Sequence, residues 1–222
     1  MAVSCSGMCD MEKIKAQAKA PYSVREEGEE LVVGTLYGEK RLSRRDVLLE
    51  RCRTCKTKKT ACYDELLGED GQDGDDSRFD GVRRLEAMTP EERFAFWRGE
   101  LSRCIRCNAC RNVCPACSCE KCVFDNPASG VENKAAANSF EENLFHIIRA
   151  FHVAGRCTDC GECSRVCPQH IPLHLLNRKL ISDINELYGP YQAGADCESK
   201  SPMTDFRYED AEPGAQWRGG VR

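Results

Sequence analysis

The sequence predicts a mainly α-helical protein that begins with a small α+β segment. Three observations lead to this fold class. Three stretches from residue 89 onward carry apolar residues at helical spacing, whereas the β-rich run is confined to residues 31–37. One unit, made of a helix, a cysteine cluster and a proline, occurs at 89–115 and again at 139–168. Such a repeat indicates an internally duplicated helical domain.

The N-terminal segment, residues 1–67, carries one clear strand signal. The β-rich run Leu31–Tyr37 is followed by a turn residue, Gly38, which predicts a small hairpin or the edge of a sheet. Residues 68–88 are rich in Asp and Gly and poor in apolar residues at their start, so they are expected to form an acidic linker.

Three helices are expected in the following domain, residues 89–189. The first begins at Thr89, a good N-cap, with Pro90 at the first helical position. The second covers 139–155 and the third lies between Pro172 and Gly189. The expected apolar stripe of the second helix consists of Leu144, Ile147, Ile148 and Phe151. Residues 123–138 are expected to form a loop, and residues 190–222 an extended tail.

The cysteine count points to metal binding. The chain has 17 cysteines among 222 residues, an odd number that argues against a closed disulfide framework. It shows neither a signal peptide nor a run of roughly 20 apolar residues that would span a membrane. A net charge of −4 gives no general basic excess for nucleic acid. We therefore expect a cytoplasmic protein whose cysteines hold metal.

Two identical cysteine motifs carry the chemistry. Cysteines separated by two, two and three residues, followed by proline, occur at 104–115 and again at 157–168. This is the bacterial-type iron–sulfur spacing, in which three thiolates of one loop bind one cluster and the fourth binds the other. A zinc ribbon also uses Cys-x2-Cys pairs. It does not require a third cysteine after a second two-residue gap, or the Cys-Pro that ends each motif.

The spacing predicts two [4Fe–4S] clusters with crossed ligands. The ligands expected for cluster 1 are Cys104, Cys107, Cys110 and Cys167. Those expected for cluster 2 are Cys157, Cys160, Cys163 and Cys114.

The layout of helices and motifs resembles the α-helical ferredoxin domain over residues 89–189. That domain occurs in the iron–sulfur subunit of fumarate reductase and in the C subunit of heterodisulfide reductase. The segments that carry a wider resemblance are "LLERCRTCKTKKTACYDELLGE" and "FHIIRAFHVAGRCTDCGECSRVCPQHIPLHLLNRKL". They are similar to the C-terminal half of deazaflavin-hydrogenase-β-like iron–sulfur proteins. The N-terminal half of those relatives has no counterpart here beyond Cys5–Met8, so its flavin site is not carried over.

Nine cysteines lie outside the two motifs, and they leave two interpretations open. In the first, Cys52 and Cys55 hold a third [4Fe–4S] cluster together with either the Cys5/Cys9 pair or the group Cys117, Cys119 and Cys122. A fourth centre would use both of these groups. In the second, several of them are buried structural thiols, since cysteine is among the most buried residue types.

Histidines and aromatic residues are expected to play supporting parts. Both motifs already have four cysteines, so the four histidines are expected to be packing or surface residues. Of the four histidines, His152 is the candidate to donate a hydrogen bond to a cluster sulfur, because it lies near the second motif. Three aromatic residues are expected in the core around the clusters: Phe94, Trp97 and Phe151.

These features favour an electron-transfer subunit of an anaerobic oxidoreductase. The resemblance implies a system of the heterodisulfide reductase, hydrogenase or formate dehydrogenase type, including flavin-based electron-bifurcating complexes. The expected partners are a flavoprotein or another iron–sulfur subunit and a catalytic subunit, with ferredoxin as a further candidate. We expect no catalytic site in the chain itself, because no Gly-rich phosphate loop or catalytic triad is recognisable. The alternative is a thiol/disulfide reductase subunit with a catalytic iron–sulfur centre.

Overall fold

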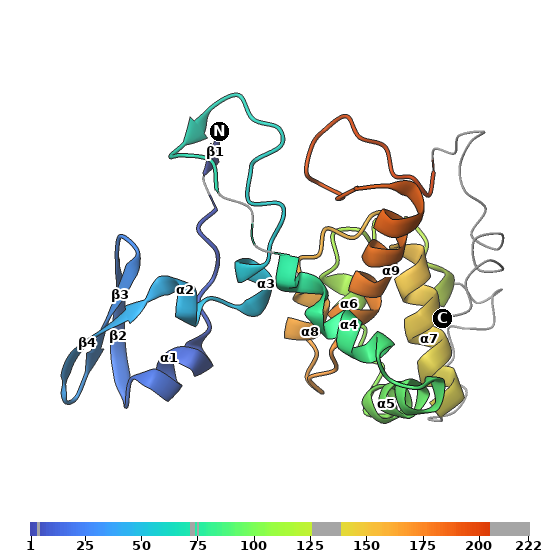
Figure 1. Ribbon diagram of the computed structural model, residues 1–222, viewed down its shortest axis with the longest axis horizontal. Coiled ribbons are helices and arrows are strands. Elements are labelled where there is room, and N and C mark those ends of the chain that lie inside the picture. Colours follow the sequence, from blue (N-terminus) through green and yellow to red (C-terminus); the bar gives the residue numbers. More distant parts are fainter. Residues whose placement is uncertain (4, 72–73, 75, 126–138, 205–222) are drawn as a thin grey trace. The chain divides into compact units, whose positions relative to one another are not determined.

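The computed structural model describes residues 1–3, 5–71, 74, 76–125 and 139–204 (Figure 1). Most of the loop expected at 123–138 and the end of the expected tail therefore lie outside the described residues. The chain divides into two compact units, Met1–Ser77 and Arg78–Arg222. Among the described residues, no helix has both the length and the apolar character needed to cross a membrane.

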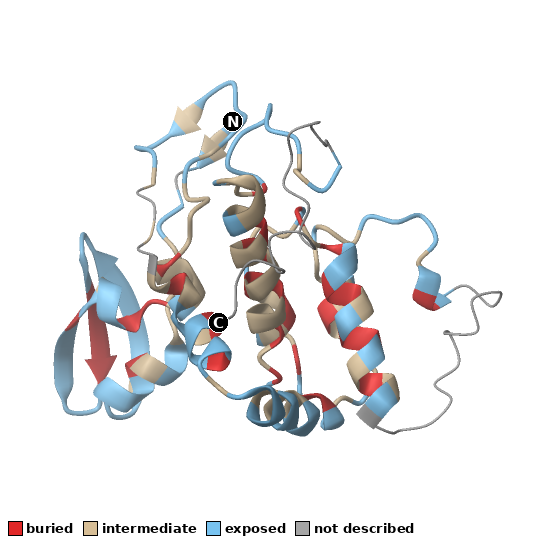
Figure 2. Ribbon diagram, turned by 45° about the vertical axis from the view of Figure 1, so that its right-hand side comes forward, coloured by how far each residue is buried: buried red, intermediate tan, exposed pale blue. Residues whose placement is uncertain are grey.

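The first unit is built on a three-stranded antiparallel sheet. Its strands follow the chain order, with β2 at Pro21–Glu27, β3 at Glu30–Thr35 and β4 at Gly38–Ser43. The hairpin expected near Gly38 is confirmed, because Thr35 pairs with Gly38 across a two-residue turn. Strand β2 was not expected, because its residues 23–27 are polar except for Val24. Figure 2 shows the buried β3 between two exposed neighbours.

Short helices complete this unit. They are α1 at Met11–Gln17, α2 at Arg44–Val47 and α3 at Glu50–Arg53, and a small parallel pair joins β1 (Ala2–Val3) to β5 (Leu66–Leu67). The Asp10 side chain caps α1 by accepting a hydrogen bond from the Glu12 amide. The core of the unit consists of Ile14, Ala18, Leu31, Val33, Leu42 and Val47. It forms because α1 and α2 cover the apolar residues of β3 and β4.

The second unit is helical. Its longer helices are α4 at Asp80–Glu86, α5 at Pro90–Ser102, α7 at Ser139–His152 and α9 at Leu173–Tyr188. Its short ones are α6 at Ala109–Asn112, α8 at Glu162–Arg165, η1 at Asp76–Phe79 and η2 at Val123–Asp125. The predicted start of α5 is confirmed: Thr89 and Glu92 form a capping box. The predicted ends of α9, Pro172 and Gly189, are confirmed as its caps.

Helix α4 lies within the segment expected to be a linker. Its Val82 and Leu85 are buried, at the i, i+3 spacing of one helix face. The acidic residues that precede it dominate the composition of the segment and conceal this short apolar face. The region 80–86 is therefore part of the packed helical unit.

Candidate iron–sulfur sites

The two cysteine motifs adopt the same backbone conformation. In the first loop Arg106 and Asn108 have left-handed φ angles of 54° and 59°, and in the second Asp159 and Gly161 have 57° and 67°. These are the second and fourth residues after the first cysteine of each motif. The Arg106 amide donates to Cys104 Sγ at 3.4 Å. Because the third cysteine of each motif then falls inside a short helix, α6 or α8, the duplication seen in the sequence is also a duplication of structure.

One cavity lies at the first motif. Four thiols line it, from Cys104, Cys107, Cys110 and Cys167. Three come from the first loop, whereas Cys167 and the adjacent Pro168 come from the end of the second motif. Apolar side chains of Ile171 and Leu173 also line the cavity.

A matching cavity lies at the second motif. Its four thiols are those of Cys157, Cys160, Cys163 and Cys114. Here Cys114 and Pro115 come from the end of the first motif. The two cavities enclose about 330 and 350 Å³, volumes that include open solvent, so they are alike in size. The structure thus brings together the two crossed sets of four thiols that the spacing predicts as ligands.

The thiols suit metal ligation. All eight are free, and the second cysteine of each motif, Cys107 or Cys160, is exposed at the cavity mouth. Burial raises the pKa of Cys104 to about 11 and that of Cys157 to about 12. Neutral thiols at these positions must release their protons to solvent when they bind iron, and the thiolate–iron bonds formed supply the energy for that release. The donor set of each cavity, four free thiols from two loops, fits a [4Fe–4S] cluster.

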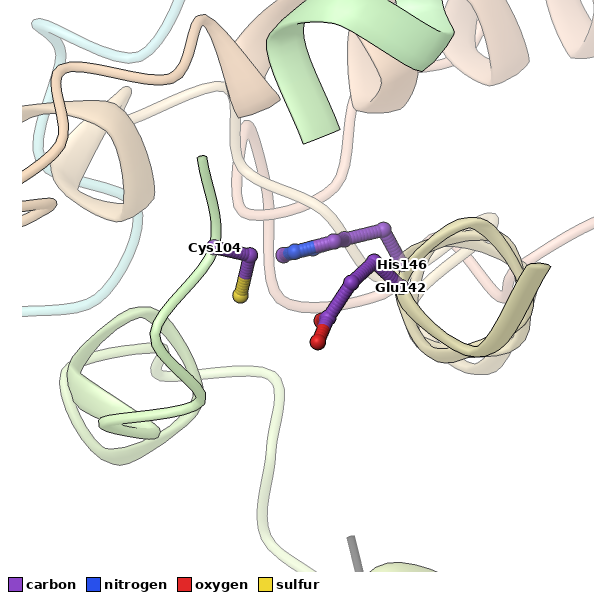
Figure 3. Close-up of side chains that lie close together, drawn as sticks. All are labelled: Cys104, Glu142 and His146. Carbon is purple, nitrogen blue, oxygen red and sulfur yellow. The ribbon is translucent and has the colours of Figure 1, made fainter. Parts of the chain in front are cut away.

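Helix α7 turns polar residues toward the first cavity. Glu142, His146 and Arg149 fall on one face of the helix and are only 2–3% exposed. A carboxylate oxygen of Glu142, a ring nitrogen of His146 and Cys104 Sγ all lie within 4.8 Å of one another (Figure 3). Glu142 is paired with Arg106, and Arg149 with the Cys110 carbonyl. The ring of His146, in contrast, has no hydrogen-bond partner among the described residues and lines the cavity. We therefore regard this face as part of the site.

This orientation contradicts the expected apolar stripe of α7. Phe151 is 62% exposed, and Leu144 and Ile147 are exposed as well. Phe94 on α5 is also exposed, whereas Trp97 packs against the core around the cysteines, as expected. His152, the suggested hydrogen-bond donor, is on the exposed side. The apolar pattern of α7 was assigned to the wrong side because pattern reasoning assumes that the apolar face is the buried one.

Arg149 lies between the two sites. Its Nη2 donates to the Cys110 carbonyl at 2.9 Å, and its guanidinium interacts electrostatically with Cys110, Cys163 and Cys114. Cys110 belongs to the first cavity, and the other two belong to the second. One buried positive charge thus acts on both sets of thiols.

Each motif loop is fastened to the helix that follows it by a buried ion pair. Arg106 Nε donates to Glu142 of α7 at 2.9 Å, and Arg178 Nε of α9 donates to Asp159 at 2.8 Å. Arg106 and Asp159 occupy the same position in the two motifs, so the pair is repeated with its charges reversed. These pairs hold the left-handed residues of both loops and thereby fix the spacing of the cysteines.

The remaining candidate cysteines fall into two groups. In the first unit, the Leu49 amide donates to the Met8 carbonyl at 2.9 Å, and Gly7 lies against the Cβ of Cys52. The segment that carries Cys5 and Cys9 therefore runs beside Cys52. Cys55 Sγ accepts from the Thr57 amide at 3.4 Å. In the second unit, Cys117 interacts with both Cys114 and Cys122, and Cys119 is exposed.

A wide apolar groove lies on the helical unit. It is lined by residues of α4, α5, α7 and α9, including Phe94, Trp97, Leu101, Ile147, Phe151 and Leu176. Leu101 is also part of the buried core that includes Cys110, Cys163 and Cys167. The groove therefore takes in Ile147 and Phe151 of the exposed stripe of α7 and shares Leu101 with the core around the cysteines.

Sequence reasoning did not single out Glu142, His146 and Arg149, which the structure places beside the thiols. Their spacing of four and three residues was visible in the sequence. A polar stripe on an amphipathic helix is ordinarily interpreted as its solvent-exposed face, so the signal pointed the wrong way. Three polar residues at helical spacing, on a helix between two cysteine motifs, would have indicated a polar helix face directed at the thiols.

Known proteins show the same type of domain. Residues 100–171 match the family model described as "4Fe-4S dicluster domain". The chain is also similar to the F420-dependent formate dehydrogenase subunit beta of Methanocaldococcus jannaschii, with 32% identity over 100 residues. That match covers 45% of this chain and 25% of the relative, so this chain corresponds to about a quarter of the length of that protein. The chain therefore carries a 4Fe-4S dicluster domain, the iron–sulfur domain to which its two cysteine motifs point.

Proposed function

We propose that this chain is the electron-transfer subunit of a multisubunit oxidoreductase and relays single electrons through two [4Fe–4S] clusters. The observation that carries the proposal is the pair of cavities, each with four free thiols at its wall. When bound, the clusters supply reversible one-electron oxidation and reduction. The protein's part is to hold them at a fixed separation, and the exchange of Cys114 and Cys167 between the motifs serves that purpose.

The proposed ligands are those of the crossed sets. Cys104, Cys107, Cys110 and Cys167 hold cluster 1, and Cys157, Cys160, Cys163 and Cys114 hold cluster 2. The exposed Cys107 and Cys160 mark the sides from which each cluster exchanges electrons. The α-helical ferredoxin fold proposed for residues 89–189 agrees with the helices α5, α7 and α9 that surround the sites.

The partners are proposed from the relative and from the surface. The similar protein is a subunit of a formate dehydrogenase, which supports assembly with a catalytic subunit and with a flavoprotein or iron–sulfur subunit. Systems of the hydrogenase and heterodisulfide reductase type are included in the proposal. The exposed apolar groove supports it too, because contiguous apolar surface of this kind is usually covered by another subunit.

The first experiment counts iron and assigns ligands in anaerobically purified protein. Two clusters require about eight irons per chain and a broad visible absorption that bleaches on reduction. Electron paramagnetic resonance (EPR) of alanine variants then tests the crossing. Cys114→Ala and Cys163→Ala are expected to alter one cluster, and Cys110→Ala and Cys167→Ala the other. Grouping by motif instead would refute the crossed ligands, and zinc in place of iron would refute the function.

A third cluster forms a second, separate proposal. The Cys5/Cys9 segment and Cys52 are neighbours within the first unit, which supports a set made of Cys5, Cys9, Cys52 and Cys55. Such a set would raise the iron content to about twelve per chain. Cys52→Ala combined with Cys55→Ala is expected to lower it to about eight. A wild-type content near eight would remove the third cluster.

Disulfide reduction is tested with the same material. The isolated chain, reduced and supplied with a small disulfide, is expected to pass on its stored electrons without multiple turnovers. Sustained catalytic reduction would instead favour the thiol/disulfide reductase.

A further inference from the structure

His146 is buried, and its ring has no hydrogen-bond partner in the described part of the chain. The side chain is 2% exposed, and neither Nδ1 nor Nε2 has a hydrogen-bond partner among the residues that the structure describes. Leaving a buried polar group without a partner costs roughly 1–3 kcal/mol. An apolar side chain of similar size would fill the same space without that cost. The presence of histidine therefore calls for something to which its ring is directed.

The ring is directed at the first cavity. His146 lines that cavity together with the four thiols, and Figure 3 shows it pointing from α7 toward Cys104. A ring nitrogen lies within 4.8 Å of Cys104 Sγ. The neighbouring Glu142 is also close, but a carboxylate only accepts hydrogen bonds, and it already accepts one from Arg106. Of the two residues, only His146 offers a donor.

The donor does not depend on the charge of the ring, because the neutral imidazole and the imidazolium both carry an N–H. Burial, and the charges of Arg149 and Arg106, lower the pKa of His146 to about 3. A neutral imidazole carries one N–H, so it donates a single hydrogen bond and adds no net charge.

The second cavity has a different donor. There Asn177 Nδ2 of α9 donates to Cys163 Sγ at 3.7 Å. The nearby His174 is engaged by the Ser164 hydroxyl at 2.9 Å. The two sites thus differ in the side chain that faces the sulfur atoms, although their thiols are arranged alike.

We propose that His146 donates a hydrogen bond to a sulfur of cluster 1 at its Cys104 corner and so raises the reduction potential of that cluster. The inference rests on the proposed function. Reduction places one more electron on the cluster, and a donor to sulfur stabilises the more negative form. The imidazole keeps its proton in both states. At the second cavity the side-chain donor is the Asn177 amide, at a long 3.7 Å from Cys163 Sγ, so the imidazole acts on cluster 1 alone.

The test uses His146→Leu in the full chain, with His146→Gln as the variant that keeps an N–H donor. His152→Leu, an exposed histidine of the same helix, is the matched control. Redox titrations followed by EPR are expected to show one cluster harder to reduce in His146→Leu. At a fixed solution potential, the ratio of the reduced to the oxidised form of that cluster should fall about fivefold. This corresponds to a reduction potential lower by about 41 mV, at about 59 mV per tenfold change. His146→Gln should restore most of the shift.

A spectroscopic readout accompanies the titration. Pulsed EPR of the reduced wild-type protein labelled with ¹⁵N-histidine is expected to show one weakly coupled histidine nitrogen, which disappears in His146→Leu. Unchanged potentials in a His146→Leu protein with full iron content would overturn the proposal. If that variant loses iron, the wild-type spectrum decides: a histidine coupling supports the hydrogen bond, and its absence overturns it. Failure of the proposed function would be recognised earlier, as wild-type protein without iron–sulfur clusters.

Discussion

Removing the charge of Arg149 is the perturbation that tests the site most directly. The guanidinium is 3% exposed, is held by the Cys110 carbonyl, and acts on thiols of both cavities. Arg149→Met keeps much of the length of the side chain and removes the charge. Both reduction potentials are expected to fall, because the reduced form of each cluster loses a stabilising positive charge.

The size of the effect follows from the depth of the site. A unit charge at about 7 Å interacts with an added electron by roughly 2.4 kcal/mol at an effective dielectric constant of about 20. For a one-electron couple this corresponds to roughly 100 mV. A charge on the surface would be screened by solvent and salt and would shift the potentials much less.

The assay is an EPR-monitored redox titration of the anaerobic full-length chain. Arg149→Lys keeps the charge and should retain most of the wild-type potentials. Arg84→Met removes the same charge from the exposed side of α4 and serves as the control. If Arg149→Met shifts the potentials no more than Arg84→Met does, the buried charge does not couple the two clusters. A shift of one cluster alone would contradict the placement of Arg149 between them.

Further predictions concern folding and metal content. Arg178→Met should destabilise the helical unit by about 3–5 kcal/mol in chemical denaturation, because it leaves Asp159 buried beside a weaker partner, Arg78, at 3.7 Å. Thr89→Ala should cost about 1 kcal/mol through loss of the capping box, measured in the same way. Gly155→Ala should cost about 1–2 kcal/mol, since φ is +70° and the new Cβ would meet Ser201. Removing iron with a chelator should lower the melting temperature of the helical unit, while chelator added to protein that never held iron should change nothing.

The sequence by itself determined the local features. Cysteine spacing specifies each motif, because ligands two residues apart are positioned by a single loop whose geometry depends on few residues. The start of α5 and both ends of α9 were predictable for the same reason, since Thr89, Pro172 and Gly189 act within one helical turn.

Only the tertiary structure decided what each helix faces. Hydrophobic periodicity assigned the apolar side of α7 to the core, but the buried side holds Glu142, His146 and Arg149. Periodicity reports that a helix has two faces, whereas burial depends on what packs against them. Here the space before the polar face is a cavity walled by thiols from two distant motifs. The exchange of Cys114 and Cys167 was already expected from the spacing, but the position of Arg149 beside thiols of both cavities appears only when the chain is folded.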